Sequence, residues 1–275
     1  MDIKLMAVDM DGTLLYSKHD ISRRVKEAVA AAAQKGVKVV ISTGRIYSSA
    51  RYYSRLLGVD TAIISCNGAF IKEHENSEII YKCSISGDAL EEIVQVLQEY
   101  NDIYYNMYSE KTYYAKEYSD VVRKYLQWNE SQPVENKINI EIMEDPKEII
   151  ARGEELFKIY LSQEHVPQGR FNELIKCINY IHGVYCVSSM ALSVDVINTK
   201  VNKGNALRVL SERYNIHPKN IMAIGDNYND LEMITFAGLG VAMGNAENEV
   251  KNAADYVTSS NMEDGVALAI EKFIL

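Results

Sequence analysis

The chain has 275 residues, and its 38 Asp and Glu against 29 Lys and Arg give a formal net charge of −9. A chain of that length can bury a large core and form one large domain or two. The acidic balance argues against nucleic acid as a partner, because affinity for its backbone is carried by clustered Lys and Arg. A small phosphorylated molecule is not excluded, because a metal ion and one or two local cations decide the potential inside a site.

The N-terminal part of the chain alternates short apolar strands with helices. Strands are predicted at residues 3–8, 37–41 and 61–65, and helices at 22–34 and 48–57. Strands that alternate with helices in this way predict a parallel sheet connected by right-handed crossovers.

The pattern changes after about Cys83, where the sequence becomes rich in tyrosine. Helices are predicted at 84–100, 118–128 and 167–180 and from Asp145 onward, and strand-like segments at 103–116, 156–161 and 185–187. This alternation predicts an antiparallel sheet backed by helices, which differs from the plan of the N-terminal part. We place a second, α+β domain at residues 84–190.

The first pattern resumes at Lys203. Helices are predicted at 204–214 and 230–236, and strands at 221–224, 239–243 and 256–257. The predicted fold class is therefore α/β, with a discontinuous parallel-sheet domain formed by residues 1–83 and 191–275 and interrupted by the inserted domain.

The cysteines and the start of the chain indicate where the protein works. Cys66, Cys83, Cys177 and Cys186 have neither metal-site spacing nor the density of a disulfide scaffold, so we expect them to be reduced. The first motif begins at Asp9, which leaves no room for a signal peptide, and no apolar run approaches membrane-spanning length. We expect a cytoplasmic protein with no membrane partner.

Two acidic segments follow predicted strands. Asp9 and Asp11 follow the strand at 3–8, and Asp226 and Asp230 follow the strand at 221–224. Ligands bind at the carboxyl ends of parallel strands, and side chains two residues apart in an extended segment point the same way. Four carboxylates gathered at one edge repel one another unless a cation lies among them, and oxygen ligands suit Mg²⁺.

A family resemblance rests on four segments in order. They are Asp9-Met10-Asp11-Gly12-Thr13, Ser42-Thr43-Gly44-Arg45, Asn202-Lys203-Gly204 and Gly225-Asp226-Asn227-Tyr228-Asn229-Asp230. Together they resemble the motifs of the haloacid dehalogenase-like (HAD) phosphohydrolases, and the long interval after the second segment resembles the Cof-type branch with its large α/β, C2B-like cap. The resemblance implies a Rossmann-like core and a Mg²⁺-dependent phosphatase. Its substrate would be a small phosphorylated metabolite, such as a sugar phosphate, flavin mononucleotide or pyridoxal phosphate.

The resemblance assigns catalytic roles to three residues. Asp9 would be the nucleophile, attacking phosphorus to form an aspartyl-phosphate. Asp11 would be the general acid toward the leaving alkoxide and then the general base for water. Lys203 begins a helix, a poor place for a cation without an anion to pair with, and would neutralise Asp9 and the transferring phosphoryl group.

Further residues are assigned to phosphate binding. Gly12 would let the backbone approach the phosphoryl oxygens, and Met10 belongs to the same loop. Thr43 would donate a hydrogen bond to a phosphoryl oxygen, with the Gly44 amide beside it at a helix N-terminus. Asn229 resembles the phosphate-contacting amide of the family.

Two more candidates carry alternative interpretations. Arg45 would either reach phosphate or substrate, or pair with a surface acid. Asn67 ends a core strand at the same edge, so it would touch substrate or the cap hinge, but ordinary turn chemistry explains it equally well. Cap tyrosines such as Tyr105 or Tyr114 would influence which ester is accepted if they face the cleft, although packing also explains aromatic residues at strand spacing.

The candidate metal-binding residues are Asp9, Asp11, Asp226 and Asp230. Asp226 is the best direct ligand, together with the Asp9 carboxylate and, by resemblance, the Asp11 backbone carbonyl. Asp230 is expected to orient this shell. Two alternative functions stay open, namely a phosphosugar mutase of the phosphomannomutase type and a catalytically silent binding or regulatory protein on the same scaffold.

Overall fold

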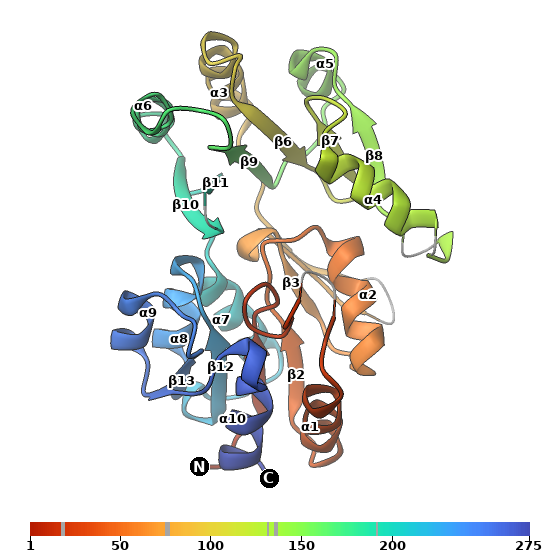
Figure 1. Ribbon diagram of the computed structural model, residues 1–275, viewed down its shortest axis with the longest axis vertical. Helices are drawn as coiled ribbons and strands as arrows, with labels where there is room; N and C mark the ends of the chain where they lie inside the picture. Colours follow the sequence, from red (N-terminus) through yellow and green to blue (C-terminus); the bar gives the residue numbers. More distant parts are fainter. Residues whose placement is uncertain (18–19, 75–77, 131, 135–136, 191) are drawn as a thin grey trace. The chain divides into compact units, whose positions relative to one another are not determined.

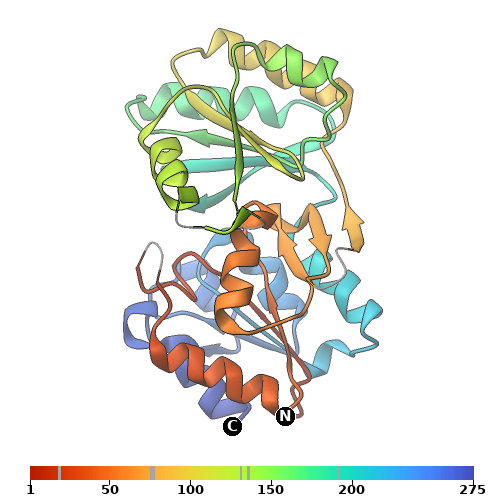
Figure 2. The same ribbon diagram turned by 90° about the vertical axis from the view of Figure 1, so that its right-hand side faces the viewer.

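The computed structural model describes residues 1–275 except 18–19, 75–77, 131, 135–136 and 191 (Figures 1 and 2). The chain forms two compact units. The first contains Met1–Arg45, Ala50–Tyr81 and Asn202–Leu275, and the second contains Ile46–Ser49 and Lys82–Val201.

A five-stranded sheet forms the core of the first unit, and each of its strand pairs is parallel. In spatial order its strands are β14 (Tyr256–Val257), β13 (Leu239–Ala242), β12 (Ile221–Gly225), β1 (Leu5–Val8) and β2 (Lys38–Ile41). Every residue of β1 and β12 is buried. Both strands are apolar throughout because a parallel sheet is covered on both faces. The α/β fold-class prediction is confirmed.

The first four helices of this unit match helices predicted from the sequence to within one residue, and the last two were not predicted. In chain order the helices are α1 (Arg23–Gln34), α2 (Tyr47–Leu57, whose first residues group with the second unit), α7 (Lys203–Arg213), α8 (Leu231–Phe236), α9 (Asn248–Ala253) and α10 (Gly265–Phe273). Ser22 caps α1 by accepting a hydrogen bond from the Val25 amide. Leu207 and Leu210 of α7 and Met233 of α8 pack with alternate residues of β1 and β12 in one apolar cluster.

The strand predicted at 61–65 belongs to a different sheet. It forms β3 (Ile63–Ser65), which meets the end of β2 only through an isolated bridge between Ser42 and Ile64. It then turns through a 3-10 turn, η1 (Cys66–Gly68), into a small sheet with β4 (Phe70–Lys72) and β5 (Ile79–Lys82). The turn follows from the Asn-Gly pair, which adopts left-handed backbone angles readily.

The second unit is built on a six-stranded sheet. Its strands, in spatial order, are β10 (Val184–Met190), β11 (Ser193–Asn198), β9 (Lys158–Ser162), β6 (Tyr104–Tyr108), β7 (Thr112–Ala115) and β8 (Asn139–Ile142). All pairs are antiparallel except β7 with β8, which is parallel and is connected through α4 (Asp120–Glu130). The other helices are α3 (Gly87–Glu99), α5 (Pro146–Ala151) and α6 (Gln168–Asn179).

This sheet also decides where the second unit ends. The sequence places the boundary at residue 190, but β11 pairs with β10 on one side and β9 on the other. The second unit therefore continues to Val201. The alternation of polar and apolar residues in Ser193-Val194-Asp195-Val196 differs from the apolar core strands, and it is the signal that could have assigned β11 to the second unit.

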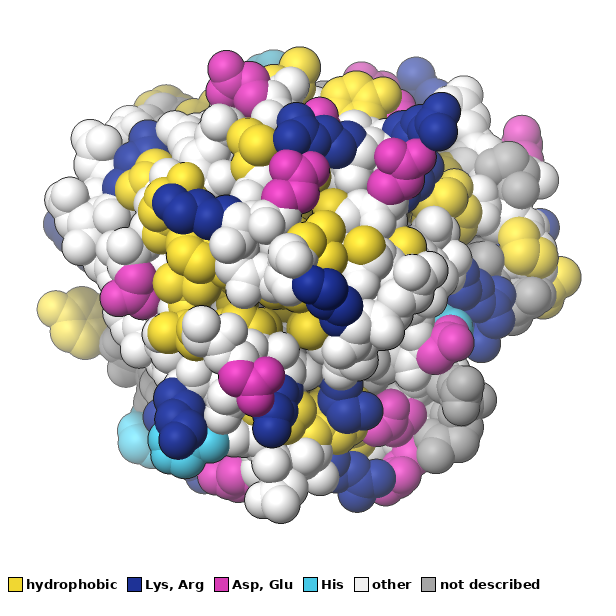
Figure 3. All heavy atoms as spheres, turned by 90° about the horizontal axis from the view of Figure 1, so that it is seen from below, with side chains coloured by type: hydrophobic (Ala, Val, Ile, Leu, Met, Phe, Trp, Pro, Cys, Tyr) yellow, Lys and Arg dark blue, Asp and Glu magenta, His cyan; other side chains and the backbone are white. Residues whose placement is uncertain are grey.

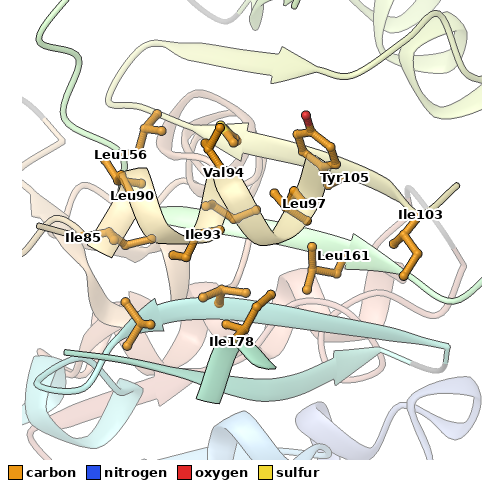
Figure 4. Close-up of a cluster of buried hydrophobic side chains, with 14 of the residues drawn as sticks. Ile85, Leu90, Ile93, Val94, Leu97, Ile103, Tyr105, Leu156, Leu161 and Ile178 are labelled. Carbon is orange, nitrogen blue, oxygen red and sulfur yellow. The ribbon is translucent and has the colours of Figure 1, made fainter. Parts of the chain in front are cut away.

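One face of the six-stranded sheet packs against helices. Figure 4 shows Leu90, Val94 and Leu97 of α3 beside Tyr105 of β6 in an apolar cluster. Tyr114 of β7 belongs to the same cluster. The tyrosines that the sequence singled out thus point into the hydrophobic core of the second unit, because strand alternation sends every second side chain to this face.

No helix in the described ranges is long and apolar enough to cross a membrane. On the face shown in Figure 3, Lys and Arg side chains are interspersed with Asp and Glu rather than gathered into one basic surface.

Candidate active site

The centre of the candidate site lies where β1 and β12 end. These strands pair in parallel with Val8 opposite Ile224, so Asp9 and Asp226 leave the sheet at the same edge. Carboxylate oxygens of Asp9, Asp226 and Asp230 all lie within 4.8 Å of one another. Three of the four predicted carboxylates therefore lie close enough together to contact one metal ion, and the Asp11 carboxylate is not in this group.

The loop after β1 is shaped by close approach to Asp226. Thr13 Oγ1 donates a hydrogen bond of 2.7 Å to Asp226 Oδ1. Gly12 has φ +83°, and a Cβ on it would lie 2.3 Å from Asp226 Oδ2. Glycine is required here both for its backbone conformation and for the space it leaves to the carboxylate.

Lys203 lies at the first position of α7, which Asn202 caps by accepting a hydrogen bond from the Asn205 amide. Its fully buried Nζ donates to Asp9 Oδ1 and to Asp230 Oδ1, each at 2.6 Å. Burial by itself lowers the pKa of Lys203, but Asp230 and Asp9 more than compensate and raise it above its ordinary value. The amine is therefore charged throughout the physiological range.

Asp230 is fully buried and uses both carboxylate oxygens. Oδ1 accepts from Lys203, and Oδ2 accepts from the backbone N–H groups of Asp226 and Asn227 at 2.9 and 3.1 Å. These bonds hold the loop after β12 and orient the lysine. Asp230 therefore acts on the centre through its neighbours, which leaves the Asp9 and Asp226 carboxylates as the better direct metal ligands.

The carboxyl groups of Asp9 and Asp226 lie where the ionised form is unfavourable. Burial raises the pKa of Asp9 well above its ordinary value, against the opposing effect of Lys203. Burial, followed by the nearby charge of Asp230, raises the pKa of Asp226 to about 7. A divalent cation would offset the negative charge of these carboxylates. Carboxylate oxygens are ligands that suit Mg²⁺, so the residues present are compatible with the expected metal.

Asp11 faces Arg45. The guanidinium donates from Nε to Asp11 Oδ2 at 2.8 Å and from Nη2 to Asp11 Oδ1 at 2.5 Å. It also lies 5.2 Å from the centre of the Tyr53 ring. Of the two interpretations that the sequence left open for Arg45, the structure therefore shows a pairing with an acid, but the acid belongs to the candidate site.

The Thr43 loop adjoins the same centre. Thr43 is fully buried, its hydroxyl oxygen accepts from the Arg45 amide at 3.1 Å, and Gly44 lies between them in the turn before α2. The Met10 side chain is also fully buried. Any contact of Met10 with a phosphate would therefore come from its backbone.

The η1 turn connects the remaining candidates. Cys66, Asn67 and Gly68 have φ of +49°, +57° and +99°. Asn67 donates its amide N–H to Thr43 O at 3.0 Å, and its side-chain Oδ1 accepts from Asn229 Nδ2 at 3.0 Å. Left-handed angles are uncommon for Cys66, unlike for asparagine and glycine, and the turn places the side-chain amide of Asn67 against that of Asn229.

Sequence reasoning missed one residue at this edge. Asn245 Nδ2 donates to the Gly12 carbonyl oxygen at 2.9 Å and so supports the loop that carries Asp9 and Asp11. Asn245 follows β13, which ends at Ala242. Its position after the next strand of the sheet is the signal that could have identified it.

The chain matches a known family over nearly its whole length. The family model described as haloacid dehalogenase-like hydrolase matches residues 6–270. The chain is 32% identical over 275 residues to the 5-amino-6-(5-phospho-D-ribitylamino)uracil phosphatase of Bacillus subtilis, covering 100% of this chain and 97% of the relative. It is 27% identical to the pyridoxal phosphate phosphatase of Escherichia coli, with 100% of both chains covered.

Solved structures show the same similarity. A sugar phosphatase of HAD subclass IIB superposes with a TM-score of 0.80 at 26% identity, and the match covers 98% of each chain. A match that covers 98% of this chain includes residues of both compact units.

Proposed function

Since the chain belongs to the haloacid dehalogenase-like hydrolases and is a phosphatase, we propose that it hydrolyses phosphomonoesters with Mg²⁺ through an aspartyl-phosphate on Asp9. The observation that carries this proposal is the buried Lys203, which bonds to Asp9 and Asp230 beside Asp226. A binding scaffold has no use for a buried lysine that balances carboxylates at the end of two parallel strands.

Asp9 is the proposed nucleophile. One carboxylate oxygen attacks phosphorus, the bond from phosphorus to the ester oxygen breaks, and the phosphoryl group is transferred to Asp9. Lys203 holds Asp9 in place at 2.6 Å and offsets the negative charge that gathers during transfer. Asp9, Asp226 and the Asp11 carbonyl would hold Mg²⁺, which when bound neutralises charge on the phosphoryl oxygens.

Asp11 is the proposed general acid and base. It gives its proton to the departing alkoxide and later takes a proton from the water that hydrolyses the aspartyl-phosphate. Arg45 holds both of its oxygens, so this pairing has to loosen before Asp11 can donate. Arg45 is thus assigned to positioning Asp11 rather than to phosphate binding.

The remaining candidates are proposed to bind the phosphoryl group. Thr43 would donate its hydroxyl, Gly44 and Met10 would offer backbone groups, and Gly12 would allow close approach. Asn229 is oriented by its bond to Asn67, which supports a shared role of this amide pair at the phosphoryl oxygens.

The proposed substrate is a small phosphorylated metabolite. Relatives are named for a phosphoribitylamino-uracil and for pyridoxal phosphate, and a structural relative is named as a sugar phosphatase. Sugar phosphates, pyridoxal phosphate and flavin mononucleotide are therefore the esters to assay first. The cytoplasmic location expected from the sequence stays a prediction, and so does a cap function for the second unit.

The proposal is tested by replacing the nucleophile. Asp9→Asn should lower phosphate release by at least about a thousandfold, because a neutral amide cannot attack phosphorus and is a weaker metal ligand. The exposed Asp2→Asn is the matched control and should behave as wild type. The assay measures free phosphate and isomerised sugar phosphate separately, so that a mutase would be recognised.

Circular dichroism should show an unchanged fold for both variants. Ordinary activity in folded Asp9→Asn would remove Asp9 from the mechanism. EDTA should abolish wild-type activity and Mg²⁺ should restore it, and full activity in chelator would contradict the metal requirement.

A further inference from the structure

The loop after β1 is closed by hydrogen bonds of its own backbone. The N–H groups of Thr13 and Leu15 donate to the Met10 carbonyl oxygen at 3.2 and 3.0 Å. Asp11 forms an isolated β-bridge with Leu15. Asp11 lies within this closed loop, so a displacement of the loop at Gly12 or at Leu15 also displaces Asp11.

Two side-chain amides hold this loop from outside. Asn245 Nδ2 donates to the Gly12 carbonyl oxygen at 2.9 Å, and Asn261 Nδ2 donates to the Leu15 carbonyl oxygen at 2.7 Å. The Asn261 backbone N–H also donates to Asn245 Oδ1 at 2.9 Å, which connects the two residues. The Asn245–Asn261 pair therefore holds the loop at two carbonyl groups that follow Asp11 in the chain.

The turn that carries Asn261 is held by contacts of its own. It is the 3-10 turn η5 (Asn261–Glu263), where the Ser260 hydroxyl and N–H donate to Glu263 Oε2 at 2.7 and 3.2 Å. After the turn, a Cβ added to Gly265 would lie 2.0 Å from the Ser259 carbonyl oxygen. These contacts fix the turn, so they also fix the direction of the Asn261 amide.

We propose that Asn245 and Asn261 are positioning residues for Asp11, which they hold where its carboxyl group can protonate the leaving alkoxide. The inference goes beyond the proposed function but rests on the role that this function gives Asp11. Both asparagines act through the backbone of the loop, because they donate to the carbonyl oxygens of Gly12 and Leu15.

The place of these bonds favours positioning over a purely structural role. The Asp11 carboxylate is held by Arg45, and that pairing has to loosen before Asp11 donates its proton. From that point the position of Asp11 depends on its backbone. A hydrogen bond near the surface adds little to stability, but misplacement of a catalytic group by about 1 Å can slow a reaction about a hundredfold.

The test compares two esters that differ in their need for an acid. The phosphorylated metabolites named above release an alkoxide, which has to be protonated, whereas p-nitrophenyl phosphate releases a stable phenolate. With the metabolite that the wild type hydrolyses fastest, Asn245→Ala and Asn261→Ala should each lower kcat/KM about tenfold. For p-nitrophenyl phosphate the loss should be less than about threefold. The ratio kcat/KM is compared because it covers the steps up to phosphoryl transfer to Asp9.

Asn220→Ala is the matched control. Asn220 Nδ2 donates to the Asp2 carbonyl oxygen at 2.5 Å, so this variant also loses a bond from a side-chain amide to a backbone carbonyl. Asn220 precedes β12, at the end of the strand opposite to Asp226. The control should alter kcat/KM for neither ester, and circular dichroism should show that all three variants are folded.

Asp11→Asn separates this inference from the proposed function. It removes the acid itself, so it should cause the same selective loss, and a larger one than either asparagine variant. When Asn245→Ala is combined with Asp11→Asn, the ratio of kcat/KM between the two esters should change no further, because no acid is left to position.

The outcomes of these measurements are distinct. Failure of the wild type to release phosphate from any metabolite, or equal losses for both esters in Asp11→Asn, refutes the proposed function. A selective loss in Asp11→Asn combined with an unchanged ester ratio in Asn245→Ala and Asn261→Ala overturns only the positioning role. A selective loss of the same size in Asn220→Ala would also overturn it.

Discussion

Lys203 illustrates how the chemistry of single residues constrains this site. Its ammonium is buried and is stabilised only because Asp9 and Asp230 lie at hydrogen-bond distance. Removing one partner of a buried charge pair leaves the other uncompensated, at a cost of about 3–5 kcal/mol. The lysine and the two carboxylates therefore form one unit, and replacing any one of them should lower the free energy of unfolding.

A pair of glycines allows backbone strain to be separated from metal-site geometry. Gly12 and Gly36 have φ of +83° and +85°, but an added Cβ meets Asp226 at Gly12 and nothing within 4 Å at Gly36. Alanine at either position should lower the free energy of unfolding by about 1–2 kcal/mol. Only Gly12→Ala should also raise the Mg²⁺ concentration needed for half-maximal activity, because the methyl group displaces the Asp226 carboxylate.

Urea unfolding and Mg²⁺ titration of activity measure these two effects. Identical Mg²⁺ dependence in Gly12→Ala and Gly36→Ala would show that contact between Gly12 and Asp226 does not control the metal site.

Among the secondary-structure elements, the first turn of α7 positions a candidate catalytic residue, because it carries Lys203. Asn202 caps α7 and precedes Lys203, while Ser22 caps α1 and donates to Asp264, and neither of those two bonds involves a candidate site residue. Asn202→Ala and Ser22→Ala should each cost about 1 kcal/mol of stability. Asn202→Ala should in addition slow turnover, because fraying of the first turn loosens Lys203.

Thermal unfolding and kcat measured on the same preparations provide the comparison. Equal kcat in the two variants at matched stability would mean that the cap does not position the lysine.

At the scale of the whole molecule, the raised carboxylate pKa values link stability to pH. In the metal-free protein the pKa of Asp226 rises from 3.8 to about 7. The folded state therefore binds a proton that the unfolded state has already lost in this range, so stability should fall as the pH rises from about 4 to 7. Under the proposed function, Mg²⁺ would bind the ionised carboxylates and should reverse the loss.

Melting temperatures measured with EDTA and with Mg²⁺ at pH 5 and pH 8 test this linkage. The stabilisation by Mg²⁺ should be several degrees larger at pH 8, since each 1 kcal/mol shifts Tm by about 2–4 °C in a chain of this size. A larger Mg²⁺ effect at pH 5 would contradict the assignment of these carboxylates as the metal site.

Local patterns in the sequence were sufficient for the core strands and for the loops that carry the candidate residues. The apolar runs before Asp9 and Asp226 predict buried parallel strands, and the ends of such strands meet at one edge. Those inferences need only strand periodicity and chain order. The same local signals could not show that β11 joins the second sheet or that β8 runs parallel to β7, because pairing partners depend on distant segments.

The sequence alone was enough to identify the family, the parallel core and the polar residues that follow the core strands at 3–8 and 221–224. The folded structure was needed to show that Asp11 pairs with Arg45 and that Asn67 bonds to Asn229. It was also needed to show that Tyr105 points into a hydrophobic core while Asn106 does not. The physical reason is that composition and spacing set which elements form. Which side chains touch depends on strand register, on the left-handed turn at Asn67 and on the rotamers that the side chains adopt. All three depend on packing against residues that are remote in the chain.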